Sequence, residues 1–279
     1  MGLELPNSLS PSKVTAFTDC PLAFKFSVID HIAPPATYVT LKGILVHEVL
    51  QIYYGQSEES RTDTSNLFEI FKSVFDRFKS NPELISLRLT TEEMLKLENE
   101  SKVLLSNYLT MENPANINAV GIELQLETVI ENIKLRGIID RLDIDSEGNF
   151  IVVDYKTGKS PAVELESSRL TGVNFYGLLC YSLLNFIPKQ VKLLYLADSV
   201  TITSEIDEER IKSYLKRTKA VWSAIERACI RDDFRPNPSF KCQWCFFSKY
   251  CPTNGGNPDL ALTELSHSSS FSIVDPEEI

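Results

Sequence analysis

The sequence of 279 residues lacks a long hydrophobic run and a recognisable export signal. Its longest apolar stretches, such as residues 175–184, are too short and too polar to span a bilayer. The first residues, MGLELP, have neither the basic start nor the apolar core of a secretory signal, and Pro6 breaks the myristoylation pattern. These absences predict a cytoplasmic protein with no membrane partner.

Positive charge is also scarce, because 28 Lys and Arg residues face 38 Asp and Glu residues, for a formal net charge of -10. This balance argues against a general nucleic-acid coat protein, which would be basic. It does not exclude a nuclease, since a carboxylate-lined metal site itself adds negative charge. No G-x-x-x-x-G-K-[ST] sequence occurs, so any DNA unwinding would need a separate helicase.

What the sequence does contain is a change of period. Apolar residues recur at helical spacing before residue 110 and then alternate as in strands. The pattern predicts helices at about residues 11–26, 39–54, 65–79, 90–108, 172–184 and 207–230. It predicts strands at about residues 118–129, 133–143, 150–155, 191–196 and 200–204. We therefore expect one α/β domain over residues 1–252, with a central mixed sheet flanked by helices, and a mostly disordered tail over residues 253–279.

The stretch from residue 137 to 156 predicts two strands with a turn between them. Folding at the turn brings Asp140 next to Asp154, and Lys156 points to the same face as Asp154. Two carboxylates can share one hard cation, and a lysine beside them can hold the attacking water or neutralise charge on a phosphate. The alternative is a surface hairpin with a salt bridge. The apolar runs at residues 138–139 and 151–153 favour a functional site, because buried charges without a role are expensive.

Three short motifs occur in order: GILVH at residues 43–47, GIIDRLD at residues 137–143 and VDYKTG at residues 153–158. Together they resemble the motifs of PD-(D/E)XK nucleases of the RecB-like exonuclease group, which includes CRISPR-associated exonucleases with an iron–sulfur cluster. The resemblance runs from about residue 10 to residue 252. It implies a restriction-endonuclease-like core and a metal-dependent DNA exonuclease of DNA repair or recombination, acting on single strands or free ends.

The resemblance also implies roles for individual residues. His47, Asp140 and Asp154 would bind Mg²⁺ or Mn²⁺, with the backbone carbonyl of Tyr155 as a further ligand, and Lys156 would be the catalytic lysine. Taken alone, His47 on an apolar helix face would more simply be a core residue.

Two further positions are less clear from the sequence. Tyr176 matches a family tyrosine of the catalytic site, but the glutamine expected four residues before it is Gly172, so Tyr176 is either functional or a packing residue. Glu123 matches an acidic position often seen in the family, but we expect an ordinary solvent-facing glutamate there.

Four of the six cysteines predict a second inorganic site. Cys242, Cys245 and Cys251 form a compact trio, which suits a soft metal or a cluster, and Cys20 is the candidate for the fourth ligand. Spacing alone leaves zinc open. In the resembling family this arrangement binds a [4Fe–4S] cluster, which would join the N- and C-terminal segments.

The remaining two cysteines, Cys180 and Cys229, lie among apolar helical residues and are expected to be buried thiols. Aromatic and basic residues are mixed around the trio: Lys241, Trp244, Phe246, Phe247, Lys249 and Tyr250. This mixture suits backbone contact and base stacking on single-stranded DNA. Equally, the aromatic rings would serve to shield a cluster from water.

The function predicted from the sequence is therefore a Mg²⁺- or Mn²⁺-dependent deoxyribonuclease. The alternatives are a non-catalytic DNA-binding or scaffolding module that keeps the fold and the metal cluster, and a zinc-bound regulator. The joint presence of Asp140, Asp154 and Lys156 favours the enzyme, since a module without chemistry needs none of them.

Overall fold

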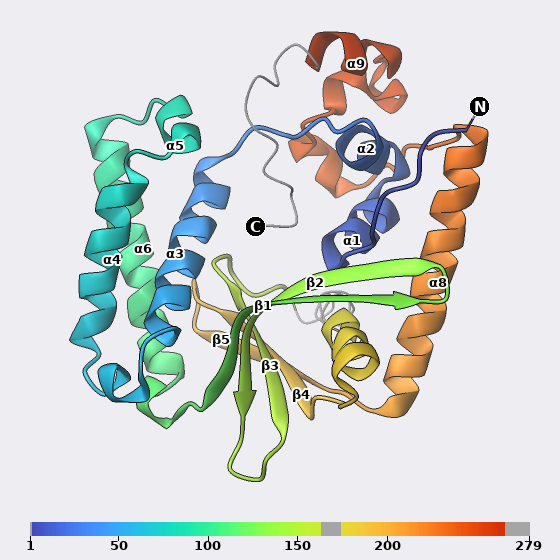
Figure 1. Cartoon of the computed structure of the whole chain (residues 1–279). Helices are drawn as coiled ribbons and strands as arrows, with labels where there is room; N and C mark the ends of the chain where they lie inside the picture. The colour runs from blue at the N-terminus through green and yellow to red at the C-terminus, as the bar shows by residue number, and fades with distance from the viewer. Residues whose placement is uncertain (1, 163–173, 266–279) are drawn as a thin grey trace. The chain divides into compact units, whose positions relative to one another are not determined.

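The computed structural model describes residues 2–162 and 174–265 (Figure 1). The chain divides into two compact units, and each is described by itself. Unit 1 consists of Met1–Pro34, Glu127–Gly137 and Glu209–Ile279, and unit 2 consists of Pro35–Leu126 and Ile138–Glu208. The single domain expected over residues 1–252 stays a prediction.

A five-stranded sheet has the order β1-β2-β3-β4-β5, which is also the order along the chain. Its strands are β1 (Ala119–Ile130), β2 (Ile133–Ile144), β3 (Phe150–Lys156), β4 (Gln190–Tyr195) and β5 (Val200–Glu205). β3 pairs with β4 in parallel, whereas the β2/β3 and β4/β5 pairs are antiparallel. The α/β class and the mixed sheet flanked by helices are thereby confirmed.

The turn between β2 and β3 is closed by one side chain. The Asp145 carboxylate accepts hydrogen bonds from the backbone N–H of Glu147 at 2.9 Å and of Asn149 at 2.8 Å. Gly148 has φ +83, a left-handed conformation that glycine adopts without a steric penalty. These local interactions set the register Arg141↔Val153 to Ile144↔Phe150 of the hairpin.

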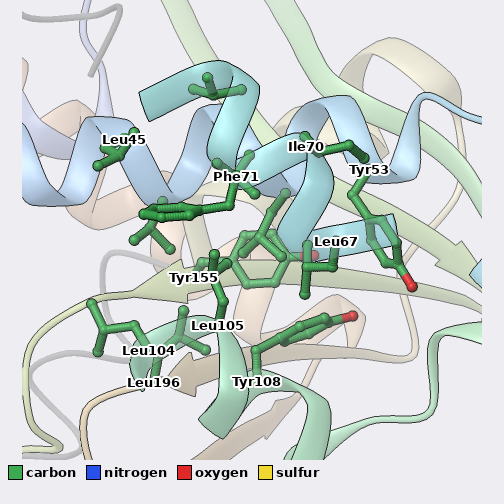
Figure 2. Close-up of a cluster of buried hydrophobic side chains, with 14 of the residues drawn as sticks. Leu45, Tyr53, Leu67, Ile70, Phe71, Leu104, Leu105, Tyr108, Tyr155 and Leu196 are labelled. Atoms are coloured by element: carbon green, nitrogen blue, oxygen red, sulfur yellow. The ribbon is translucent and has the colours of Figure 1, made fainter. Parts of the chain in front are cut away.

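The core of unit 2 lies between one face of the sheet and three helices that lie side by side in Figure 1: α3 (Tyr38–Tyr54), α4 (Ser65–Phe78) and α6 (Thr91–Met111). Figure 2 shows Leu45, Phe71 and Leu105 packed with Tyr155. Each such fully buried side chain stabilises the fold by about 1.5–3 kcal/mol. Short helices surround this core: η2 (Glu58–Arg61), α5 (Pro82–Ser86), which the sequence did not predict, and η3 (Pro114–Asn116).

The same packing decides where the charged residues of β3 point. Ile151, Val153 and Tyr155 belong to the core under the helices. Because side chains alternate along a strand, Asp154 and Lys156 project from the opposite face. Residues 174–179, which are helical, and η4 (Cys180–Leu184) follow the undescribed segment of residues 163–173, which includes Gly172.

Unit 1 joins the two ends of the described chain through apolar packing. Its helices are α1 (Pro11–Asp19), α2 (Pro21–Phe24), η1 (Lys25–Ile29), α8 (Glu208–Arg231), η5 (Phe240–Trp244), η6 (Ser248–Tyr250), η7 (Pro252–Asn254) and α9 (Asp259–Leu265). Leu22, Phe26 and Ile32 pack with Phe247, Tyr250 and Ala261. The predicted helix over residues 11–26 is interrupted at Cys20, whose backbone is extended between α1 and α2.

For the tail over residues 253–279, which the sequence predicts to be mostly disordered, the structure describes residues 253–265. α9 forms over Asp259–Leu265, and Ala261 is fully buried in the unit 1 core. The run Leu260–Leu262 is short and apolar, but nothing in the sequence indicates that Ala261 packs with Leu22, Phe26 and Ile32 of the distant N-terminal segment. Over the described part of the chain, no helix is both long and apolar enough to cross a membrane.

Candidate metal and catalytic site

The hairpin brings its two predicted carboxylates together. The β2/β3 register ends at Arg141↔Val153, and one step further along the pair places Asp140 opposite Asp154. The Tyr155 backbone N–H donates to Asp140 Oδ2 at 2.7 Å, which fixes this carboxylate at the strand end. Both acids are largely buried, with an exposed fraction of 11% for the Asp140 side chain and 5% for Asp154.

His47 reaches this point from α3. Its Nε2 lies 3.1 Å from the Tyr155 carbonyl oxygen, and its Nδ1 lies 3.6 Å from Asp140 Oδ2. One ligand atom each from His47, Glu123 and Asp140 lies within 4.8 Å of the others, close enough to share a cation. The predicted partners His47 and Asp140, 93 positions apart in the sequence, therefore meet at one place.

Glu123 is not the solvent-facing glutamate expected from the sequence. It is half-buried on β1 and belongs to the group of candidate ligands with His47 and Asp140. Its backbone has φ 45, a conformation that costs energy for a residue with a side chain and that is concentrated at functional sites. Simple strand alternation cannot reveal such a departure. The resemblance to the nuclease motifs was the one signal for this residue.

The crowding of carboxylates shifts their protonation. Burial raises the pKa of Asp140 to about 6, with a contribution from Asp154, against the opposing effect of His47. Burial, and then the charge of Asp140, raises the pKa of Glu123 to about 7. The raised pKa values of these two acids show that nearby positive charge does not offset their burial. A bound divalent cation would favour the ionised carboxylates and lower both pKa values.

Lys156 and Tyr176 contact the other carboxylate, Asp154. Lys156 Nζ lies 2.6 Å from Asp154 Oδ2. Burial acts to lower the pKa of Lys156, but the charges of Asp154 and Asp140 outweigh it and raise that pKa. The Tyr176 hydroxyl donates to Asp154 Oδ1 at 3.5 Å, a long hydrogen bond. Burial holds the pKa of Tyr176 well above its usual range, so Tyr176 is a neutral donor.

These residues fit a hard divalent cation. The donors are carboxylate oxygens, a carbonyl oxygen and one imidazole nitrogen, a set suited to Mg²⁺ or Mn²⁺. His47 Nε2 and the Tyr155 carbonyl oxygen lie 3.1 Å apart, a hydrogen-bond distance, so both atoms are available at the same point. Asp154 Oδ2 is buried and, apart from its ion pair with Lys156, makes no hydrogen bond to the described residues, so it retains acceptor capacity.

Comparison with known proteins agrees with this geometry. The model of the PD-(D/E)XK nuclease superfamily matches residues 8–252, most of the chain and parts of both units. The chain belongs to the PD-(D/E)XK nuclease superfamily. Members of this superfamily are generally nucleases that act on DNA with Mg²⁺ or Mn²⁺, so membership indicates a metal-dependent nuclease.

Among solved structures, the chain is similar to one described as "Crystal structure of SSO0001", with 15% sequence identity and a TM-score of 0.35. The similarity covers 76% of this chain and 96% of that one. No curated protein matches the chain.

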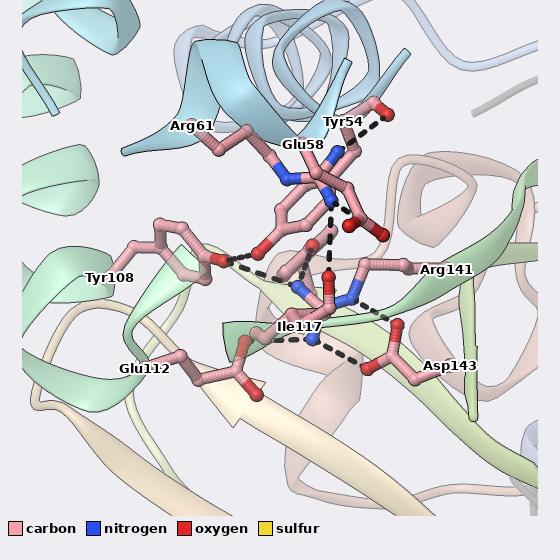
Figure 3. A network of polar contacts seen from close by, with 9 residues as sticks. Tyr54, Glu58, Arg61, Tyr108, Glu112, Ile117, Arg141 and Asp143 are labelled. Atoms are coloured by element: carbon pink, nitrogen blue, oxygen red, sulfur yellow. Dashed lines mark hydrogen bonds and ion pairs between the residues drawn. The ribbon is translucent and has the colours of Figure 1, made fainter. Parts of the chain in front are cut away.

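A buried arginine supports the nuclease hairpin from the core side. Arg141, fully buried next to Asp140, makes two hydrogen bonds to Asp143, at 2.8 and 2.9 Å, and one to Glu112 at 2.8 Å (Figure 3). It also donates to the hydroxyls of Tyr155 at 2.6 Å and Tyr108 at 3.2 Å. This network holds Tyr155, and the backbone of Tyr155 in turn contacts Asp140 and His47 at the candidate site.

The four predicted cysteine ligands also converge, within unit 1. Burial raises the pKa of the Cys245 thiol, and the nearby Cys20, Cys242 and Cys251 add to the shift. Backbone N–H groups already point at two of the sulfurs, from Asn237 to Cys20 at 3.5 Å and from Ser239 to Cys242 at 3.3 Å. Cys180 and Cys229 are buried, as predicted.

The raised carboxyl pKa values predict a steep pH dependence of metal binding. A protonated carboxyl is a poor ligand, so Mn²⁺ affinity should fall as pH is lowered from 8 through the pKa values of Glu123 and Asp140, about 7 and about 6. Glu123→Gln removes one of the two titrating carboxyls, so the plot of Mn²⁺ affinity against pH should become flatter above pH 6.5. Calorimetric titration with Mn²⁺ measures this, with the exposed strand residue Glu127→Gln as control. An unchanged slope in Glu123→Gln would exclude Glu123 from the metal shell.

The Arg141 network predicts a large effect on stability. Arg141→Leu leaves Asp143 and Glu112 without their buried cation, which should lower the free energy of unfolding by about 3–5 kcal/mol. Arg77→Leu is the matched control, because Arg77 pairs with Glu48 at the surface with 62% of its side chain exposed. Its loss should be at most about 1 kcal/mol. Urea titrations compare the two variants, and equal losses would contradict the role given to Arg141.

Proposed function

We propose that this chain is a metal-dependent DNA exonuclease of RecB-like type, acting in DNA repair or recombination on single strands or free ends. Any unwinding comes from a separate helicase. The observation that carries this proposal is the meeting of His47, Glu123 and Asp140 at the end of the strand pair that bears Asp154 and Lys156. A scaffolding module would have no use for carboxylates crowded together in this way, with Asp154 buried and Asp140 and Glu123 partly buried.

One group of residues would hold the cation, and a second would stabilise negative charge on the phosphate. His47, Asp140, Asp154, Glu123 and the Tyr155 carbonyl would hold Mg²⁺ or Mn²⁺, which when bound polarises the phosphate and lowers the pKa of its water.

Lys156 and Tyr176 form the second group. The raised pKa of Lys156 keeps it cationic, so it acts as an electrostatic donor to phosphate oxygens rather than as a base. Tyr176, neutral and bonded to Asp154, keeps that carboxylate in place.

We further propose that Cys20, Cys242, Cys245 and Cys251 hold a [4Fe–4S] cluster rather than zinc. Four thiolates on one zinc ion, at about 2.3 Å each, would lie about 3.8 Å apart. Among the described residues, no three of these sulfurs form a group within 4.8 Å, although the four thiols influence one another. The two N–H···S contacts fit thiolates that carry negative charge.

Lys156→Ala tests the nuclease directly. It should lower the rate of DNA hydrolysis at least about 100-fold, as expected for loss of one charge-stabilising donor. The assay uses Mn²⁺ and labelled single-stranded oligonucleotides under anaerobic conditions, with Lys159→Ala, an exposed lysine three positions on, as the control. The proposal fails if the unaltered protein degrades no DNA or if Lys156→Ala degrades it equally well.

The same assay resolves the type of nuclease. Oligonucleotides blocked at the 5′ or the 3′ end give the polarity, and a circular single strand should resist an exonuclease. Degradation of the circle would replace the exonuclease proposal with an endonuclease.

Cys20→Ser tests the cluster. Anaerobically purified protein should be brown, with a broad absorbance near ~400 nm from thiolate-bound iron. Cys20→Ser should lose most of this absorbance, whereas Cys180→Ser, at a buried thiol of unit 2, should keep it. A colourless protein that contains stoichiometric zinc would overturn the cluster in favour of the zinc site.

A further inference from the structure

The aromatic residues around the cysteine trio fall into two structurally different sets. Phe247 and Tyr250 are each only 5% exposed and pack in the unit 1 core with Leu22 and Phe26. Cys20, Cys245 and Cys251 pack against the same core. These inward rings already serve to shield the cysteines from water.

Phe240 and Trp244 have no such role. They are 67% and 71% exposed, among the most exposed large apolar side chains of the described chain. Their ring centroids lie 6.3 Å apart in an edge-to-face arrangement, so the two rings form one exposed pair. Phe246, at 40% exposed, lies two residues further along.

The turn that carries this pair is well fixed. Ser239 caps η5, with its hydroxyl accepting from Lys241 N–H at 3.3 Å and its own N–H pointing at Cys242 Sγ. Phe240 and Trp244 therefore stand on a short helix held at Cys242 and followed by Cys245. A fixed pair of rings loses little conformational entropy when a flat ligand stacks on it.

Charge favours an anionic ligand over a cationic or neutral one. Residues 234–258 contain Arg235, Lys241 and Lys249 and no Asp or Glu, in a chain of net charge -10. Two of these bases already have acidic partners, Arg235 with Asp233 and Lys241 with Asp19. The local field is thus only weakly positive, and ring stacking rather than phosphate contact must supply most of the affinity.

We propose that Phe240 and Trp244 form a stacking platform for the bases of single-stranded DNA. This inference rests on the proposed nuclease function and adds a strand-holding surface in unit 1 to it. Every base offers a flat face, so the platform binds strands without regard to sequence.

The test measures binding without cleavage. A fluorescein-labelled 12-nucleotide oligothymidine is titrated with the full chain, anaerobically and in EDTA. Trp244→Ala and Phe240→Ala should each weaken binding roughly tenfold, the scale expected for loss of one stacked base, and Trp244→Tyr should largely restore it. Ile230→Ala, at an exposed apolar residue of the same unit (74% exposed), should bind as the unaltered protein does.

Two readouts separate stacking from other causes. The chain has two tryptophans, of which Trp222 is only 6% exposed, so the oligonucleotide should quench the emission of Trp244, and this quenching should disappear in Trp244→Tyr. The slope of affinity against salt should stay the same in Trp244→Ala, because no phosphate contact is lost. Visible absorbance and metal content of each variant verify that the cysteine site is intact.

The outcomes also separate this inference from the function on which it rests. If the unaltered protein binds and degrades DNA but Trp244→Ala and Phe240→Ala bind as tightly, the platform is wrong and the nuclease stands. Absence of quenching on binding has the same meaning. If the unaltered protein neither binds nor degrades DNA, both proposals fall, and the exposed rings serve another kind of partner.

Discussion

The nuclease site depends on how one buried charge is satisfied. Arg141 has no access to solvent, and in that position an unpaired guanidinium would destabilise the fold by several kcal/mol. Asp143 and Glu112 balance the charge, and three tyrosines surround it, with the ring of Tyr54 4.5 Å from the guanidinium. The network allows Arg141 few alternative positions. Asp140, the next residue on β2, is therefore held in place as well.

Tyr155 carries that constraint from the core to the site. Its ring and hydroxyl contact Arg141 in the core under the helices, while its N–H binds Asp140 and its carbonyl lies beside His47. Tyr155 thus links the paired charges around Arg141 to the crowded carboxylates beside His47. The two networks differ in charge balance: Arg141 meets carboxylates of its own fold, whereas Glu123, Asp140 and Asp154 crowd together beside one lysine, Lys156. That imbalance is what a cation site requires before its cation binds.

The sequence was sufficient where local rules decide the structure. Strand alternation and the Asp145–Gly148 turn predicted the hairpin, and hence Asp140 opposite Asp154, because turn and register are set by neighbouring residues. The ordered motifs added His47. Glu123 was misjudged because its position depends on a left-handed backbone conformation that alternation cannot reveal. α9 was missed because Ala261 packs into a core that Leu22, Phe26 and Ile32, over 200 residues away, build together with Phe247 and Tyr250.

The roles of the aromatic residues near Cys242, Cys245 and Cys251 likewise depend on packing that the sequence does not show. From composition, these aromatic residues were equally suited to shielding and to stacking. Burial assigns Phe247 and Tyr250 to shielding, and leaves Phe240 and Trp244 available for a ligand. The candidate metal-binding carboxylates and the exposed rings lie in different units. Substitutions in the two places should therefore have different effects. Those at the carboxylates and Lys156 should change the rate of hydrolysis, and those at the rings should change how long a strand stays bound.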